Sequence, residues 1–192
     1  SGDIGLMQKL STRVENGETY YYTGCYVGPF NCILKSKDLV NWIYVSQPTF
    51  TNDSQWENAT YVLNDKVYYC VRQYADKSNC AFLTYYDLIS EQWADPVYIY
   101  EAQSRYDFFE YGGNLYLIHS PKDRNHLAIM MVNKTYLNYS YDIQVAVVPN
   151  YFYPFVQVYG NDLYVSFTAS RQHIYLSKVT LGSLSNNRII NK

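Results

Sequence analysis

Short runs of alternating apolar and polar residues, broken by two-residue turns, follow one another along the sequence. Four turn pairs stand 48 residues apart, and a tyrosine-bearing apolar run follows each; the pairs are Asn16-Gly17, Asn64-Asp65, Gly112-Gly113 and Gly160-Asn161. Such pairs between alternating runs are a strong short-range signal for a β-hairpin. The spacing therefore predicts an internal repeat of 48 residues, with four copies in the chain.

Each repeat is expected to contain four short strands, the first before the turn pair and the second after it. The third strand is predicted at 32–35, 80–85, 127–131 and 174–178, and the fourth at 42–45, 97–100, 143–148 and 188–190. Four-stranded antiparallel units repeated at this spacing are typical of β-propeller blades. The two-residue alternation excludes a helical repeat.

We therefore predict an all-β protein that folds as a single β-propeller over residues 1–192. Its four blades would span about 1–48, 49–96, 97–144 and 145–192. An unclosed propeller exposes apolar blade faces and strand edges. If the ring has more than four blades, we expect self-association, or blades supplied by other sequence or another chain, to complete it.

Composition agrees with strands and excludes several classes of protein. The chain has 24 tyrosines, and tyrosine favours strands. Its 48% hydrophobic and 17% charged residues are enough for a buried core and exclude intrinsic disorder. A net charge of −2 argues against nucleic acid as a partner, and no apolar run is long enough for a transmembrane helix.

Candidate site residues come from the repeat itself, because the entrances to the first strands of propeller blades converge at one end of the axis. The 48-residue step relates four such positions, Lys9, Glu57, Arg105 and Tyr153. The positions one residue earlier include two aromatic residues, Trp56 and Phe152. Asp107 is the one acid within an otherwise apolar inner strand. These seven residues form the predicted axial site.

Charged and aromatic side chains around one cleft suit a polar ligand with an apolar face, such as a sugar. Arg105 would grip a carboxylate, and Lys9, Trp56 and Phe152 would line the substrate. If the protein is a glycoside hydrolase, Glu57 would be the acid/base. Tyr153 or Asp107 would then be the nucleophile or stabiliser. The alternative is that these are ordinary surface residues, whose ion pairs contribute only ~0–1 kcal/mol.

Two stretches resemble known families. Residues 36–42, Ser-Lys-Asp-Leu-Val-Asn-Trp, resemble the Ser-x-Asp-Leu-x-x-Trp segment of five-bladed glycoside hydrolases, the arabinanase, xylosidase and invertase-like group. A looser version runs from Asp87 to Trp93, and both are similar to a shortened sialidase Asp-box. The resemblance implies a structural turn, in which the Asp accepts backbone hydrogen bonds and the Trp packs between blades.

The second stretch, within residues 153–177, contains Tyr-Pro-Phe-Val, Leu-Tyr-Val-Ser-Phe-Thr and Ile-Tyr-Leu-Ser, and is similar to the last blades of sialidase-like proteins. The resemblance implies a carbohydrate-active propeller, either a glycoside hydrolase or sialidase-like. Sialidases use three arginines on the substrate carboxylate, whereas only Arg105 stands at a strand entrance here; Arg13 and Arg171 lie elsewhere in their repeats. A non-catalytic glycan- or protein-binding propeller and a structural module of a larger surface protein are therefore the alternatives.

The four cysteines form two local pairs, Cys25 with Cys32 and Cys70 with Cys80, and each pair flanks a predicted turn. Their spacing, without nearby histidine, does not suit zinc, and no phosphate-binding glycine loop is present, so we expect no metal and no cofactor. Possible disulfides and four N-glycosylation sequons, one at Asn58, favour an extracellular or surface location. Free buried thiols and chance sequons are the alternative.

Overall fold

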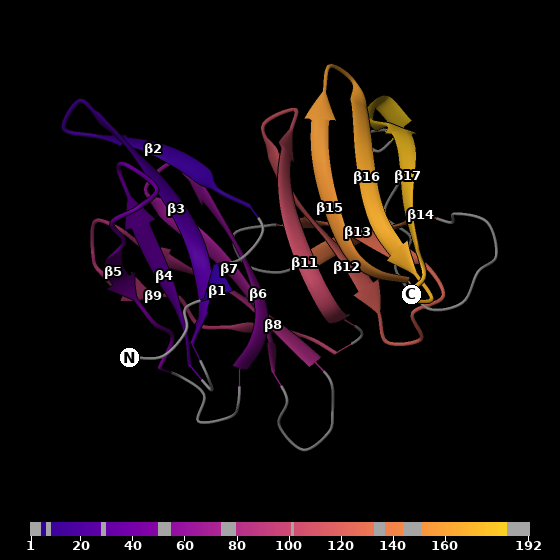
Figure 1. Cartoon of the computed structure of the whole chain (residues 1–192), viewed down its shortest axis with the longest axis horizontal. Helices are drawn as coiled ribbons and strands as arrows, with labels where there is room; N and C mark the ends of the chain where they lie inside the picture. The colour runs from indigo at the N-terminus through magenta and orange to yellow at the C-terminus, as the bar shows by residue number, and fades with distance from the viewer. Residues whose placement is uncertain are drawn as a thin grey trace. The chain divides into compact units, whose positions relative to one another are not determined.

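The computed structural model describes residues 5–6, 9–27, 30–49, 55–73, 80–100, 102–132, 137–143 and 151–183. These residues form four antiparallel sheets, as Figure 1 shows, which confirms the predicted all-β class. The chain divides into two compact units, Ser1–Glu101 and Ala102–Lys192. Each unit contains two of the sheets.

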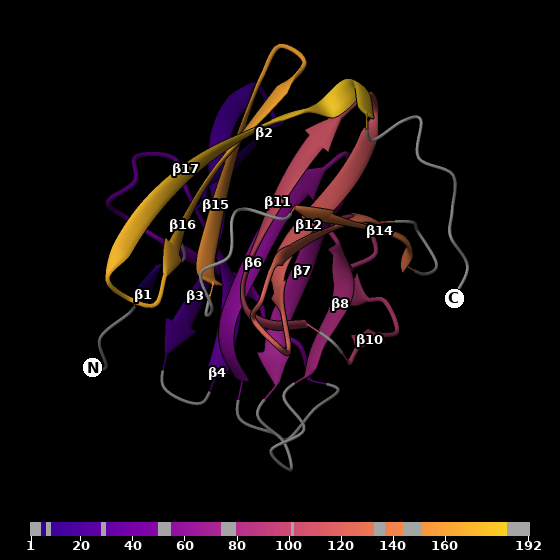
Figure 2. The same cartoon turned by 90° about the vertical axis from the view of Figure 1, so that its right-hand side faces the viewer.

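The first unit holds two sheets of five strands each. In the first sheet β3 is central, pairing with β1, β2 and β4, and β5 pairs with β4. Its strands are β1 (Gly5–Leu6), β2 (Ser11–Glu15), β3 (Glu18–Val27), β4 (Phe30–Ser36) and β5 (Ile43–Ser46). The second sheet runs in the order β6, β7, β8, β10, with β9 also on β8; β6, β7 and β8 lie side by side in Figure 2. Its strands are β6 (Gln55–Leu63), β7 (Lys66–Gln73), β8 (Cys80–Asp87), β9 (Gln92–Trp93) and β10 (Val97–Ile99).

The second unit holds two meanders. The third sheet contains β11 (Ala102–Tyr111), β12 (Asn114–Pro121), β13 (Leu127–Val132) and β14 (Leu137–Ile143), in chain order. The fourth contains β15 (Tyr151–Tyr159), β16 (Asp162–Ala169) and β17 (His173–Thr180), followed by the short 3-10 helix η2 (Leu181–Ser183). The expected four strands in every repeat are therefore not confirmed, because the described sheets have five, five, four and three.

The four turn pairs all connect neighbouring strands of one sheet, as the sequence predicts. Each contains backbone in the left-handed region, which Gly and Asn adopt at least cost; the residues are Asn16, Gly17, Asn64, Gly112, Gly113 and Gly160. The turns therefore fix the register of each first hairpin locally.

One strand of the third sheet, β14, was not predicted as such. The fourth strand of the third repeat was expected at 143–148, but β14 ends at Ile143, which pairs with Leu127. Its sequence, Leu-Asn-Tyr-Ser-Tyr-Asp-Ile, alternates apolar and polar residues, but the more continuous apolar run after it gave the stronger signal. Residues 144–148 and the expected strand at 188–190 lie outside the described residues.

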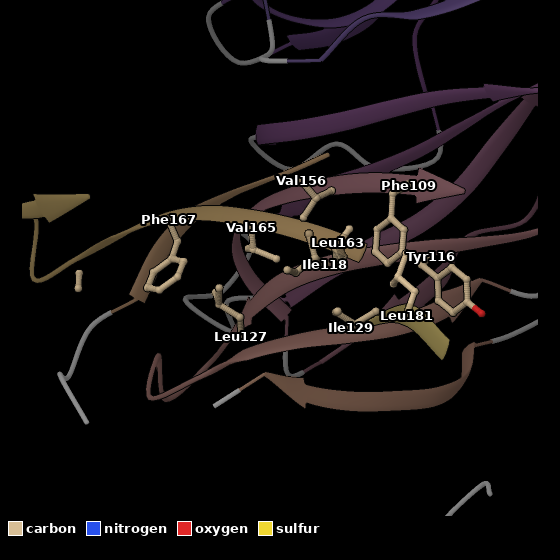
Figure 3. Packing of buried hydrophobic residues seen from close by; sticks show 11 residues of the cluster. Phe109, Tyr116, Ile118, Leu127, Ile129, Val156, Leu163, Val165, Phe167 and Leu181 are labelled. Atoms are coloured by element: carbon tan, nitrogen blue, oxygen red, sulfur yellow. The ribbon is translucent and has the colours of Figure 1, made fainter. Parts of the chain in front are cut away.

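Each unit has a hydrophobic core that holds its two sheets together. In the first unit Tyr22 and Ile33 of the first sheet pack with Val71 and Phe82 of the second. In the second unit Figure 3 shows side chains of β11–β13 pointing toward those of β15 and β16, including Phe109, Ile118, Val156 and Phe167. Burying one such side chain stabilises the fold by about 1.5–3 kcal/mol.

Candidate functional site

The first strands of three sheets are bulged at their entrances. The register shifts between Gln55 and Asn58 in β6, between Ala102 and Tyr106 in β11, and between Phe152 and Phe155 in β15. Three of the predicted site residues, Glu57, Arg105 and Tyr153, lie within these bulges. A bulge interrupts the ladder and redirects a side chain, and bulges are frequent next to active sites.

The seven predicted site residues fall in both units. Lys9, Trp56 and Glu57 belong to the first unit, and Arg105, Asp107, Phe152 and Tyr153 to the second. The single axial site that would join them stays a prediction.

In the second unit, the bulges of β11 and β15 bring arginines and aromatic rings together. The Arg105 guanidinium lies over the Tyr153 ring, 4.6 Å from its centroid. Two further guanidinium groups lie over the neighbouring Phe152 ring, Arg124 at 4.4 Å and Arg171 at 5.2 Å. The Phe152 and Tyr153 rings are themselves 5.9 Å apart. We call these five residues the arginine–aromatic cluster.

The backbone of this cluster is unusual. Arg105, Arg124, Arg171 and Tyr153 have φ angles of 28°, 54°, 56° and 56°. Residues other than Gly, Asn and Asp rarely adopt this left-handed backbone conformation, and each instance costs on the order of 1–3 kcal/mol. Such strain concentrates at functional sites. Its presence at four of the five residues therefore points to a selected geometry of the cluster.

The cluster is a cationic patch on a partly buried aromatic base. Phe152 is buried, Arg105, Arg124 and Tyr153 are half-buried, and Arg171 is exposed. Within the described residues, Arg105 and Arg171 form no ion pair with a carboxylate, and the buried Nε of Arg105 has no hydrogen-bond partner. A guanidinium donates through five N–H groups and matches a carboxylate with two parallel hydrogen bonds. The arrangement can therefore receive an anionic group.

Asp107 is close to Arg105 in sequence, but its carboxylate forms hydrogen bonds with the backbone of two sheets. It is 1% exposed, its Oδ1 accepts the backbone N–H of Phe108 at 2.9 Å, and its Oδ2 accepts that of Val156 at 2.8 Å. The second bond joins β11 to β15. The carboxylate therefore accepts hydrogen bonds from two buried backbone donors, one on each strand.

The first unit contains a smaller group. Arg72 Nη1 lies 3.2 Å from Oε2 of Glu57, and both side chains are largely buried. The Arg72 guanidinium also lies 6.0 Å from the centre of the Trp56 ring, which is 40% exposed. Lys9 is half-buried just before β2, and its carbonyl accepts the Thr23 hydroxyl at 3.3 Å. Glu57 is thus held against an arginine beside an accessible aromatic face.

Two turns behave as the resemblance to the Asp-box implies. Asp38 Oδ1 accepts the backbone N–H groups of Val40 and Asn41 at 2.9 and 2.7 Å, and these bonds lower the pKa of the Asp38 carboxyl. Asp87 does the same for Ile89 and Ser90, and the pKa of Asp87 is lowered by the same cause. The first turn connects β4 to β5, and the second connects β8 to β9.

The tryptophan of the second turn packs as the resemblance implies. The Trp93 ring lies edge-on to Tyr69, and its Nε1 donates to Ser46 Oγ of the first sheet at 2.9 Å. This contact ties two sheets of the first unit together. Its role is structural.

Sequence reasoning did not place Arg124 and Arg171 at the site. Arg124 lies in the turn between β12 and β13, and Arg171 in the turn between β16 and β17. In an antiparallel meander the turn from the second to the third strand lies at the same end as the entrance to the first. A signal was therefore present, because these two residues occupy nearly equivalent positions of consecutive repeats, 47 residues apart.

The described residues contain no group of three or more His, Cys, Asp or Glu side chains that could hold a metal ion. No helix in the described part of the chain has the length and hydropathy to cross a membrane. Asn58, one of the four sequon asparagines, is buried and donates from Nδ2 to the carbonyl of Cys25 at 3.1 Å. A glycan has no room there.

No protein-family description matches this chain, and no curated protein sequence is significantly similar to it. Solved structures are similar in fold. A mutant of the GH43 protein BlXynB from Bacillus licheniformis superposes with a TM-score of 0.64 at 18% identity, over 92% of this chain and 40% of that one. The α-L-arabinofuranosidase CtGH43 from Clostridium thermocellum gives 0.62 at 14%, over 89% and 68%.

The NanB sialidase of Streptococcus pneumoniae is also similar, with a TM-score of 0.57 at 17% identity, over 86% of this chain and 28% of the sialidase. The resemblance to glycoside hydrolase and sialidase-like propellers is therefore confirmed for the fold. The chain spans about two fifths of the length of BlXynB, so it resembles part of that protein.

Proposed function

We propose that this chain is part of a carbohydrate-active propeller and that the arginine–aromatic cluster binds a sugar bearing a carboxylate. The observation that carries the proposal is the gathering of three guanidinium groups over the Phe152 and Tyr153 rings, on left-handed backbone. The rings offer an apolar face to the sugar. The guanidinium groups offer charge-assisted hydrogen bonds to its anionic group.

Arg105 and Arg171 are the residues best suited to hold the carboxylate. Neither forms an ion pair with an acidic side chain among the described residues. Arg105 lies over the Tyr153 ring and Arg171 over the Phe152 ring, and these two rings are adjacent. A hydrogen bond to a charged group contributes about 1.5–3 kcal/mol. Each arginine therefore accounts for roughly a 10- to 100-fold gain in affinity.

Binding is tested by titrating the protein with sialosides and uronosides in Arg105→Ala and Arg171→Ala variants. Lys178→Ala is the matched control, since Lys178 is an exposed cation of the same unit whose partner is Asp162, at the other end of β16 and β17. We expect the two arginine variants to lose roughly 10- to 100-fold in affinity and the control to match wild type. Equal affinity in all four proteins would overturn the proposal.

Hydrolysis is the second function we propose; Glu57 is the candidate acid/base in the first unit, and Tyr153 is the candidate nucleophile in the second. The accessible Trp56 ring beside Glu57, and the guanidinium of Arg105 over Tyr153, support these assignments. Asp107 is better suited to holding β11 and β15 together, because both its oxygens accept buried backbone N–H groups. Release of aryl aglycone that disappears in Glu57→Gln and Tyr153→Phe would support hydrolysis. Binding without turnover leaves a glycan-binding propeller.

The assembly in which this site works is also a proposal. One propeller over residues 1–192, with blades at the 48-residue repeats, accounts for the four sheets and for the similarity to glycosidase propellers. Self-association or blades from other sequence would complete a larger ring. An extracellular or surface location would expose the site to glycans.

A further inference from the structure

The end of the β3–β4 hairpin carries two thiols in contact. Cys25 of β3 and Cys32 of β4 are directly opposite each other in the strand register, and their sulfur atoms are 3.0 Å apart. Both cysteines are free. Directly opposite positions on antiparallel strands bring Cα atoms to within about 4.5–5.5 Å, inside the range that a disulfide requires.

The other two cysteines do not share this geometry. Cys70 is opposite Leu83, and Cys80 is opposite Gln73, so these two thiols are three positions apart along the β7–β8 ladder. The sequence spacing alone made the two pairs equivalent. In the structure, Cys25 and Cys32 form an adjacent pair, whereas Cys70 and Cys80 are two separate buried thiols.

The thiol pair lies between two hydrogen bonds that hold β6. The carbonyl of Cys25 accepts Asn58 Nδ2 at 3.1 Å, and Asn31, which precedes Cys32, donates from Nδ2 to the carbonyl of Trp56. Asn58 and Trp56 flank Glu57 in the β6 bulge. A covalent bond between the two strands would therefore fix the groups that hold this bulge.

We propose that Cys25 and Cys32 form a thiol–disulfide site that low-molecular-weight disulfides oxidise, closing a cross-strand bond behind the β6 bulge. Solvent reaches the pair at Cys32, which is half-buried, whereas Cys25 is fully buried. The bond adds a covalent clamp to a hairpin that otherwise depends on strand pairing. This site is independent of the arginine–aromatic cluster.

The exchange is balanced in two steps. The Cys32 thiolate attacks one sulfur of the small disulfide, forming a mixed disulfide and expelling one thiolate. The Cys25 thiolate then attacks Sγ of Cys32, forming the Sγ–Sγ bond and expelling the second thiolate. Two electrons pass from the cysteine pair to the small disulfide, and the two protons pass to the released thiols. In the reduced pair the hydrogen bond between the two sulfur atoms lowers the pKa of the Cys25 thiol and raises that of the Cys32 thiol, so the first step requires the shared proton to pass from Cys32 to Cys25.

The test is a thiol count on the folded chain after incubation with oxidised glutathione, followed by peptide mapping. We expect free thiols, measured in denaturant, to fall from the four of the sequence to two, with Cys25 linked to Cys32. Dithiothreitol should restore all four. The Cys70→Ser variant should still lose two thiols, whereas Cys32→Ser should lose none. Oxidation should also raise the midpoint of thermal unfolding by roughly 5 °C or more, because the bond restricts the unfolded chain.

Four free thiols in wild type after oxidation would overturn the proposal, and so would a linkage to Cys70 or Cys80. Glutathione that stays attached to Cys32 without a cross-link would also overturn it. The wild-type count needs no substitution, so it decides the question even where a serine variant fails to fold.

Discussion

The residues near the strand entrances are of two kinds, those that hold the sheets together and those that present charged or aromatic groups. Asp107 turns inward and accepts two backbone N–H groups, one of them from the neighbouring sheet. Arg105, two positions earlier, turns its guanidinium to the Tyr153 ring. Backbone strain marks the second kind, since Arg105 and Tyr153 have positive φ angles. Structural and candidate binding roles therefore fall on different residues, even where these are only two positions apart.

The assignment of Asp107 makes a stability prediction. Asp107→Ala would remove the two hydrogen bonds that the carboxylate accepts from the N–H groups of Phe108 and Val156, and a hydrogen bond to a charged group contributes about 1.5–3 kcal/mol. We expect the free energy of unfolding, measured by urea titration, to fall by about 2–4 kcal/mol. Ser11→Ala is the matched comparison, because Ser11 occupies the same repeat position and accepts one N–H, that of Val62 at 3.0 Å. A purely catalytic Asp107 would leave the unfolding curve unchanged.

The candidate residues at strand entrances could be named from the sequence because the 48-residue step marks equivalent positions. Their partners were missed, although Arg124 and Arg171 occupy nearly equivalent positions of consecutive repeats. Arg124 and Arg171 reach Phe152 from turns, through left-handed backbone that no residue pattern indicates for arginine. The twofold backbone bonding of Asp107 likewise depends on how β11 lies against β15.

At the scale of elements, turn chemistry decides which strands were predictable. Asn-Gly and Gly-Gly pairs specify tight turns locally, so the first hairpin of each sheet was correctly placed. β14 was missed although its sequence alternates apolar and polar residues, because the more continuous apolar run that follows it was taken for the fourth strand. Where two neighbouring runs compete, the partner strand decides which of them pairs.

Packing between the sheets of the first unit requires one glycine. A Cβ at Gly24 of β3 would lie 1.8 Å from Oδ1 of Asn58 on β6. We expect Gly24→Ala to lower the free energy of unfolding by about 1–3 kcal/mol, because Asn58 must move and lose its bond to the Cys25 carbonyl. Gly182→Ala is the control, since nothing lies within 4 Å of a Cβ there. If the two variants unfold alike in a urea titration, the close approach is not a constraint.

At the scale of the whole molecule, the fold is shared with glycosidases while the sequence is not. Identities of 14–18% to the GH43 structures show that the same sheets are built from largely different residues. Fold alone does not determine function, which depends on the side chains of the site. The proposed function therefore depends on the local cationic surface, in a chain whose net charge is −2.

The central claim is that this surface recognises a carboxylate on a sugar. The most direct measurement is calorimetric titration of the intact chain with a carboxylated glycoside and with its neutral methyl ester. We predict that the carboxylate form binds at least roughly 10-fold more tightly and that the difference shrinks as salt is added. Equal binding of the two forms, or no binding of either, would contradict the account.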